Sequence, residues 1–326
     1  MQRLTSRLTG RTARRLGDER GAAAVVLSLL MVPMLGFAAI AVDVGALYAE
    51  RARLQIAADA AAFAVAQDCA RGACGDMFAT ASDVVQANDG DATTAPPVLS
   101  SAPLSVQVTG STPVQHWFAP VIGHDATGVT ATATVGWGSP DAGTAVLPLT
   151  FSWCEFERQT GGGLPSATTV HTINLTKSTP AEKSCTGPSG NFVPGGFGYL
   201  DTEPGNCRAA SAINTRSHSS TGNAVPSSCS QADASSWLDR TVLLPIFDEY
   251  GGTGNNAWYR VYGYAAFRLT GYDFGGQYHT GKNTCLGNGS DRCVTGYFTR
   301  FVDLSEAFSY SSDAPALGTA ILRLIR

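Results

Sequence analysis

The residues best suited to chemistry in this 326-residue chain are a pair of carboxylates and eight cysteines. Asp248 and Glu249 precede Gly251 and Gly252, a pattern that could serve acid–base catalysis or a calcium loop. An exposed acidic turn is the favoured interpretation, because the alternating Asp or Asn of a calcium-binding loop do not follow. The sequence also lacks a nucleophile elbow, an HExxH motif, a Walker loop and a dinucleotide fingerprint. We therefore expect no enzymatic activity and no cofactor.

The cysteines show neither CxxC spacing nor accompanying histidines, since only five histidines are scattered along the chain. A zinc site is therefore not expected, and disulfides in an oxidising compartment are the better interpretation. Sequential pairing is the simplest arrangement, and closeness in the chain favours Cys69–Cys74 and Cys285–Cys293. The disulfide candidates are Cys69, Cys74, Cys154, Cys185, Cys207, Cys229, Cys285 and Cys293.

The element that must position all of these groups is an apolar segment near the N-terminus. Residues 22–42 carry no charge, and a helix of that length covers about 30 Å, the thickness of the hydrocarbon core of a bilayer. We predict a transmembrane helix over residues 21–45. Pro33 and Gly36 lie within the span, where a membrane helix tolerates them.

Three residues at the end of this span have types that suggest contacts. Ala41 and Gly45 form a small-xxx-small pair, which suits close packing against another helix. Asp43 lies at the outer edge, where a carboxylate is costly unless it reaches water or a partner. It either has such a partner or only marks the membrane boundary.

The charges on the two sides of the span predict its orientation. The first 20 residues contain six arginines against two acidic residues, whereas the rest of the chain contains 16 basic and 24 acidic residues. The arginine excess predicts a cytoplasmic tail over residues 1–20 and an extracytoplasmic remainder. The acidic remainder does not suit nucleic acid. We expect a single-pass cell-membrane protein with a cytoplasmic N-terminus.

Cleavage of the span as a signal peptide is the alternative to its retention. Residues 39–41 fit a small-x-small cleavage site. The apolar run before that site is long for a signal peptide, and the helical pattern continues past it. We therefore expect the N-terminus to stay attached.

The helix is expected to continue outside the membrane as a stalk, over residues 46–90. Seven of the ten residues from 57 to 66 are alanine, the best helix former. The segment is either a simple helical stalk or a helix whose small-residue face packs tightly against a partner helix.

At these residues the chain resembles the TadE/TadG-like proteins of Flp (tight adherence) pilus assembly. The resemblance is strong over residues 20–68 and looser to about residue 138, and the C-terminal part looks like that of actinobacterial members. It implies a membrane-anchored extracytoplasmic component with a structural or anchoring role. It also implies that other pilus assembly proteins or pilins contact the transmembrane and stalk helix, with contact to the cell wall as a further possibility. The matching features are Arg20-Gly21, Pro33, the Ala41-Val42-Asp43-Val44-Gly45 step, Tyr48, Arg51, Leu54-Gln55 and Ala57-Ala58-Asp59-Ala60-Ala61.

Two departures from related patterns narrow this role. Prepilins carry a glutamate five residues after the cleaved glycine, but Val26 stands at that distance from Gly21. Processing by a prepilin peptidase is therefore not expected. The string closest to the Asp-x-Ser-x-Ser metal site of von Willebrand A-like domains is residues 233–237, with Trp237 at the second serine position. No metal site is expected there.

The expected fold class is α+β. A strand–helix–strand pattern predicts a small α/β module at residues 98–138, and a turn at residues 139–143 marks the next boundary. Residues 144–326 are predicted to form a β-rich extracytoplasmic domain. Its clearest strand is at residues 258–269, and its loop-rich part at residues 177–230 needs disulfide staples.

A second function depends on the aromatic residues of this domain. An anchored cell-surface binding module, for glycan or for protein adhesion, could use four tyrosines as a ligand surface. Packing within the sheet explains the same residues equally well. The tyrosines are Tyr262, Tyr264, Tyr272 and Tyr278.

Overall fold

The computed structural model describes residues 19–179, 181–219, 221–281, 285 and 291–325. The expected cytoplasmic tail, residues 1–20, therefore lies outside the described residues except for its last two. The chain divides into two compact units. The first comprises Met1–Arg53 with Thr112–Val129, and the second comprises Leu54–Ser111 with Thr130–Arg326.

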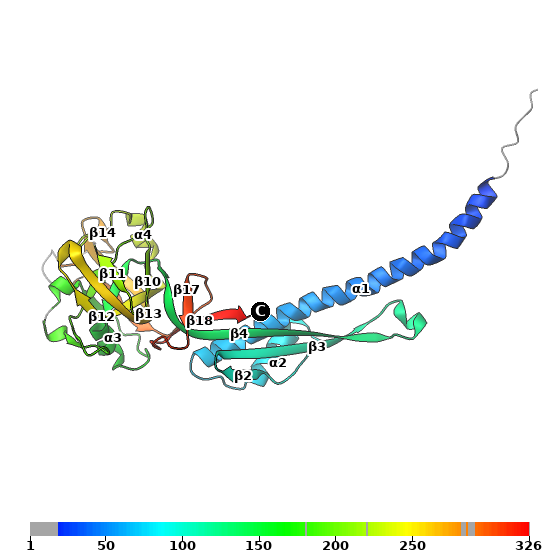
Figure 1. Ribbon diagram of the computed structural model, residues 1–326, viewed down its shortest axis with the longest axis horizontal. Helices are drawn as coiled ribbons and strands as arrows, with labels where there is room; N and C mark the ends of the chain where they lie inside the picture. Colours follow the sequence, from blue (N-terminus) through cyan, green and yellow to red (C-terminus); the bar gives the residue numbers. More distant parts are fainter. Residues whose placement is uncertain (1–18, 180, 220, 282–284, 286–290, 326) are drawn as a thin grey trace, which may run out of the picture. The chain divides into compact units, whose positions relative to one another are not determined.

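A single helix, α1 (Glu19–Ala70), contains both the predicted span and the start of the predicted stalk (Figure 1). Pro33 lies inside it without ending it. The large apolar side chains between Val25 and Val44 are mostly exposed. By length and composition, α1 is the one helix of the described residues that could cross a membrane. The predicted long apolar helix at the N-terminus is thus confirmed.

The alanine-rich part of α1 belongs to the second unit and is buried there. Its buried side chains recur every three or four residues, so they occupy one helix face. A Cβ built on Gly110 would lie 3.0 Å from Leu54 Cδ1 and 3.7 Å from Val85 Cγ1, which shows how closely the helix approaches the sheet. The fully buried residues of this face are Leu54, Ala57, Ala58, Ala61, Ala62, Val65 and Ala66.

This packing corrects the expectation of a stalk over residues 46–90. The segment contains the end of α1, a turn, and a second helix, α2 (Met77–Asn88), whose Ala81 and Val85 are also buried. Gln55 Nε2 donates a hydrogen bond to the carbonyl oxygen of Thr132 in the sheet, at 3.2 Å. The small-residue face therefore packs on the chain's own helix and sheet rather than on a partner helix. Small side chains permit this approach, and the pattern does not reveal which surface they meet.

The first sheet has the strand order β1-β3-β4-β18-β16, and β2, β10 and β17 pair with strands of this row. The last strand of the chain, β18, runs antiparallel to β4, so that Ile321 lies opposite Gly138 and Ile325 opposite Thr134. The strands of this sheet are β1 (Thr93–Thr94), β2 (Val98–Ser101), β3 (Leu104–Gln115), β4 (Ala126–Ala145), β10 (Ala209–Ala212), β16 (Phe301–Asp303), β17 (Phe308–Ser311) and β18 (Thr319–Ile325).

The predicted boundary at residues 139–143 is wrong, because these residues lie inside β4. Pro140 cannot donate a ladder hydrogen bond, and it is accommodated where the register of β17 shifts between Ser309 and Tyr310. Residues 98–138 are consequently not a separate module. The strand β4 continues past them, and the C-terminal strand β18 completes their sheet.

The second sheet has the order β6-β15-β13-β12-β5-β9, with β11 and β14 also paired to β13. The predicted strand at residues 258–269 lies within β13, in its first two-thirds, and β13 is the longest strand of this sheet. The strands are β5 (Leu149–Ser152), β6 (His171–Asn174), β9 (Phe197–Tyr199), β11 (Arg216–Ser219), β12 (Thr241–Gly251), β13 (Ala257–Gly275), β14 (Tyr278–His279) and β15 (Cys293–Thr299).

The core of the second unit lies on both faces of β12 and β13. On one face, edge-to-face rings surround Phe151, with Phe267 at 4.9 Å and Phe298 at 5.9 Å between ring centroids. On the other face, Tyr264 packs against Phe308 of the first sheet, so the two sheets share a core cluster. The remaining elements are α3 (Trp153–Thr160), α4 (Gln231–Ser236), β7 (Cys185–Thr186), β8 (Phe192–Val193) and the 3₁₀ turns η1 (Ala119–Ile122), η2 (Thr176–Ser178), η3 (Ala181–Lys183) and η4 (Gly254–Asn256).

All eight cysteines are joined in sequential pairs, Cys69–Cys74, Cys154–Cys185, Cys207–Cys229 and Cys285–Cys293. The second and third pairs hold residues 177–230, where regular structure is sparse. The α+β fold class is confirmed, with a long apolar helix followed by disulfide-stapled sheets.

Gly296 offers a test of the close packing in the second sheet. A Cβ at this position would lie 2.1 Å from the carbonyl oxygen of Arg268 and 2.5 Å from Phe267 Cε1. Because backbone atoms block it, we expect Gly296→Ala to lower the free energy of unfolding by roughly 1–3 kcal/mol or more. Gly90→Ala is the control, since nothing lies within 4 Å of its Cβ position. Thermal unfolding of the detergent-solubilised protein compares the two, and equal melting temperatures would contradict the packing.

Candidate functional site

The carboxylate pair at residues 248 and 249 lies in an ion-pair cluster on β12. Asp248 is fully buried and accepts a hydrogen bond from the Ser189 hydroxyl, and its Oδ1 lies 3.8 Å from Arg260 Nη1. Glu249 lies 3.6 Å from the same guanidinium and 3.8 Å from Arg216. Each carboxylate therefore faces an arginine, an arrangement that holds neighbouring strands together. The predicted exposed turn is wrong for Asp248, because β12 carries this residue into the interior.

The string at residues 233–237 forms a helix cap. Ser230 Oγ donates to Asp233 Oδ2 at 2.6 Å, and the Asp233 amide donates back to Ser230 Oγ at 3.2 Å. The hydrogen bonds from Ser230 hold the pKa of Asp233 below its usual value. Such a capping box satisfies the amides at the start of α4. Among the described residues, no group of three or more His, Cys, Asp and Glu could hold a metal ion.

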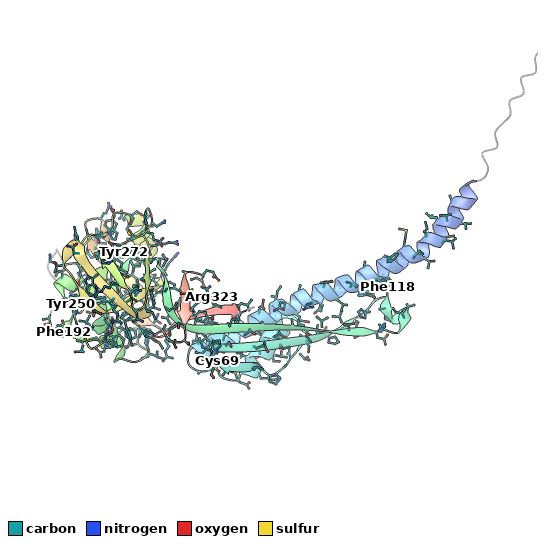
Figure 2. The ribbon with its side chains drawn as sticks, in the orientation of Figure 1. Cys69, Phe118, Phe192, Tyr250, Tyr272 and Arg323 are labelled. Carbon is teal, nitrogen blue, oxygen red and sulfur yellow. A yellow bond between two sulfur atoms is a disulfide. The ribbon has the colours of Figure 1, made fainter. Side chains whose placement is uncertain are left out.

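The four tyrosines do not form an exposed aromatic surface. Tyr264 and Tyr272 are buried, and Tyr262 and Tyr278 pack against the core of the second unit (Figure 2 labels Tyr272). The Tyr278 hydroxyl donates a hydrogen bond to the carbonyl oxygen of Cys229 at 2.9 Å. Burial raises the pKa of Tyr264 to about 12 despite its hydrogen bond with Ser211, so this phenol stays neutral. The four tyrosines on which the binding-module alternative depends therefore belong to the packing of the core and do not offer a ligand surface.

Asp43, in contrast, makes a specific polar contact within the first unit. Asp43 as a residue is 6% exposed. Oδ1 accepts a hydrogen bond from the amide of Trp117 at 2.8 Å, and Oδ2 accepts one from Ala119 at 2.8 Å and one from Phe118 at 3.2 Å. The sequence predicts that Asp43 either has a partner or only marks the membrane boundary. The structure shows a partner, the three amides of residues 117–119.

The three amides belong to the turn between β3 and β4, which contains η1 (Figure 2 labels Phe118 at this turn). The first amides of any helical turn lack partners within the turn. Phe118 occupies the cap position, and its side chain makes no capping hydrogen bond. Asp43, from a helix more than 70 residues earlier in the chain, supplies the missing acceptor. We call residues 117–122 the hairpin tip.

The hairpin tip presents apolar side chains to the outside. Val121 is 90% exposed, Trp117 79%, Ile122 75% and Phe118 48%. Behind them, His116 Nε2 makes a hydrogen bond of 2.8 Å with Thr127 Oγ1 across the two strands. The site thus consists of a carboxylate clamp on α1 and an exposed apolar tip that the clamp holds.

The other candidates on α1 contact no other part of the described chain closely. Pro33, Gly36, Ala41 and Gly45 are exposed, and nothing lies within 4 Å of a Cβ built on either glycine. The structure therefore brings only Asp43 of this set together with another segment. The Ala41–Gly45 pair remains a prediction about a second protein chain.

Comparison with protein families adds one finding. Residues 21–68 match the family model described as putative Flp pilus-assembly TadE/G-like. The matched segment includes the exposed apolar part of α1, Asp43, and the alanine-rich face that packs in the second unit. No curated protein and no solved structure matches the chain. The actinobacterial type of the C-terminal part remains a prediction.

Sequence reasoning found Asp43 but missed its partner. The only signal near residues 117–122 is a run of large apolar residues beside Pro120, and it resembles an ordinary buried turn. The helix of the strand–helix–strand pattern expected over residues 98–138 is only one short turn in the structure, because β3 continues to Gln115 and only Ala119–Ile122 is helical.

Proposed function

We propose that this chain is a membrane-anchored extracytoplasmic component of Flp pilus assembly with a structural or anchoring role. The observation that carries the proposal is the TadE/G-like match over residues 21–68, on a helix whose first part is apolar and exposed. An exposed apolar helix surface of this length is favourable in lipid and unfavourable in water.

The proposed orientation places the N-terminus in the cytoplasm. Six arginines precede the span, and positively charged flanks stay on the cytoplasmic side. All eight cysteines follow the span and are paired, which suits an oxidising extracytoplasmic compartment. Both features support the same topology.

We also propose that the protein is not an enzyme and needs no cofactor. The carboxylates at 248 and 249 face arginines, and the shifted tyrosine pKa values move away from neutrality. Such groups stabilise a fold and are poorly placed to transfer protons near pH 7. The proposed partners are pilins or other pilus assembly proteins, which the exposed Ala41–Gly45 face of α1 would meet inside or near the membrane.

Complementation of a deletion strain tests this role. We expect loss of Flp pili on deletion and recovery with the full-length chain, because the helix anchors the extracytoplasmic region at the assembly site. A secreted version, in which a cleavable signal peptide replaces residues 1–42, should not restore piliation. Pilus counts by electron microscopy and immunoblots of membrane and medium fractions measure both outcomes.

A third variant separates anchoring from helix contacts. It replaces residues 22–42 with an unrelated single-pass helix and keeps Asp43 and all that follows. Recovery by this variant would assign only anchoring to the span, whereas failure would assign it partner contacts as well. Full piliation by the secreted version would contradict the proposal.

A further inference from the structure

We propose that the hairpin tip, residues 117–122, inserts into the outer interface of the same bilayer that α1 crosses. This inference rests on the membrane anchoring proposed above, and it adds a second, separate contact with lipid. The tip exposes four large apolar side chains within six residues. A patch of this kind is uncommon on a water-facing surface unless something covers it.

The position of the tip along α1 points to lipid as the occupant. The Asp43 carboxylate binds the amides of Trp117, Phe118 and Ala119 directly, so the tip lies level with Asp43. Asp43 follows the last residue of the charge-free segment at residues 22–42. A helix that spans the bilayer with this segment therefore holds the tip where hydrocarbon gives way to headgroups.

The composition of the hairpin agrees with this depth. No Asp, Glu, Lys or Arg occurs between Asp91 and Asp125, a stretch that includes all of β3 and the tip. The tip itself therefore has no charged side chain to desolvate, and Asp43, which holds it, already has hydrogen-bonded oxygens. The nearest charged residue of the hairpin, Asp125, is exposed at the base of the tip, where its carbonyl oxygen accepts a hydrogen bond from the His116 amide at 3.0 Å and its side chain can stay in water. Trp117 is of the type enriched at the membrane interface, and Tyr48, 73% exposed on α1, is another.

The contact also gives a reason for a carboxylate at this position. A free carboxylate at the edge of the hydrocarbon is unfavourable, as are free amides. Pairing them lets both enter the interface together. A helix in a membrane can otherwise rotate about its axis, and a second lipid contact to one side of α1 restrains that rotation. The exposed Ala41–Gly45 face would then be presented in one direction.

The test uses the full-length protein in phosphatidylcholine–phosphatidylglycerol vesicles. A cysteine is introduced at Val121 and labelled with an environment-sensitive fluorophore without reduction, since the native cysteines are all paired. Lipids with a nitroxide near the headgroup end of the acyl chain serve as quenchers for Val121, and lipids with a nitroxide near the methyl end serve as quenchers for the reference inside the span. Leu30→Cys is the reference inside the span, and Phe192→Cys, 68% exposed in the second unit, is the water-facing reference.

We expect the Val121 label to show blue-shifted emission and to lose most of it to the quencher, whereas the Phe192 label keeps its emission. Quenching at Leu30 with none at Val121 would overturn the inference and leave the anchoring intact. No quenching at Leu30 would overturn the anchoring itself. A blue-shifted Val121 label that lipid does not quench would show that protein covers the tip, which also overturns the inference.

The native tryptophan supplies an independent measurement. The emission difference between the wild type and Trp117→Phe reports on Trp117 alone among the five tryptophans. We expect this difference signal to be quenched by the same lipids, without any label at the tip. An unquenched difference signal would count against insertion.

Discussion

Asp43→Ala should release the hairpin tip from α1 and make it sensitive to protease. The substitution removes the acceptor of three amides, of Trp117, Phe118 and Ala119. Buried donors without a partner cost roughly 1–3 kcal/mol, although amides that can move into water recover part of that. We therefore expect the free energy of opening the tip to fall by about 2 kcal/mol, which raises the population of the open form roughly 30-fold.

Chymotrypsin measures this release, because it cleaves after Trp117 and Phe118 and needs an extended backbone to do so. The rate of cleavage at these two positions follows the population of the open form when opening is fast. Mass spectrometry of the detergent-solubilised protein after short digestion identifies the cut sites. Piliation of a strain that carries only Asp43→Ala should fall as well, if the clamp positions the helix.

Two control variants separate the hydrogen bonds from other effects of the change. Asp43→Asn keeps one carbonyl oxygen as an acceptor but turns a donor group towards the remaining amides, so its effect should be intermediate. Asp83→Ala removes an exposed carboxylate from α2 and should leave cleavage at the tip unchanged. Cleavage of Asp43→Ala at the wild-type rate would show that Asp43 only marks the membrane boundary.

The local parts of this fold could be predicted from the sequence, because they depend on local chemistry. The charge-free run at residues 22–42 and the alanines that follow define α1 on propensity and hydrophobicity alone. The alternation at residues 258–269 similarly predicts β13. In each case the pattern can be recognised from residues that are close together in the sequence.

The parts that could not be predicted depend on contacts between distant segments. The partner of Asp43 lies more than 70 residues away, and nothing in residues 117–122 indicates a carboxylate acceptor. The turn expected at residues 139–143 fails for a related reason. Proline and glycine usually end a strand, but here a bulge next to Pro140 in β4 and close contact of Phe308 with Gly143 suit those residue types.

The candidate site shows the same division. The carboxylate at residue 248 was identified by type, but its burial was not, because β12 carries it inside and Arg260 comes from a neighbouring strand. The tyrosines alternate along β13 as a surface row would, yet Tyr264 faces a second core that the first sheet completes. A strand with both faces covered cannot be recognised from its own alternation.

Removal of the two long-range disulfides should unfold the sheets of the second unit. Cys154–Cys185 and Cys207–Cys229 close loops with sequence separations of 31 and 22 residues. The chain-entropy model assigns about 3–4 kcal/mol to each. Their combined loss is comparable to the roughly 5–15 kcal/mol that stabilises a typical domain.

Burial makes the loss larger for the first pair. Cys154 is 2% exposed and packs with Val193, Leu200 and Phe247, while Cys185 lies against the same cluster. Alanine is the appropriate replacement, because a serine hydroxyl there would be buried among apolar groups. We expect the four-alanine variant to lose its cooperative thermal transition and to be digested by trypsin in the membrane fraction.

Cys69–Cys74 provides the matched control, since it closes a loop with a separation of only five residues. The same model assigns about 2 kcal/mol to it. Its removal should lower the melting temperature modestly and leave a cooperative transition, because the adjacent helices stay packed through Leu54 and Val85. Reduction of the wild type with dithiothreitol should reproduce the four-alanine result. Equal melting temperatures with and without reductant would show instead that the sheets hold the loops of residues 177–230 without their disulfides.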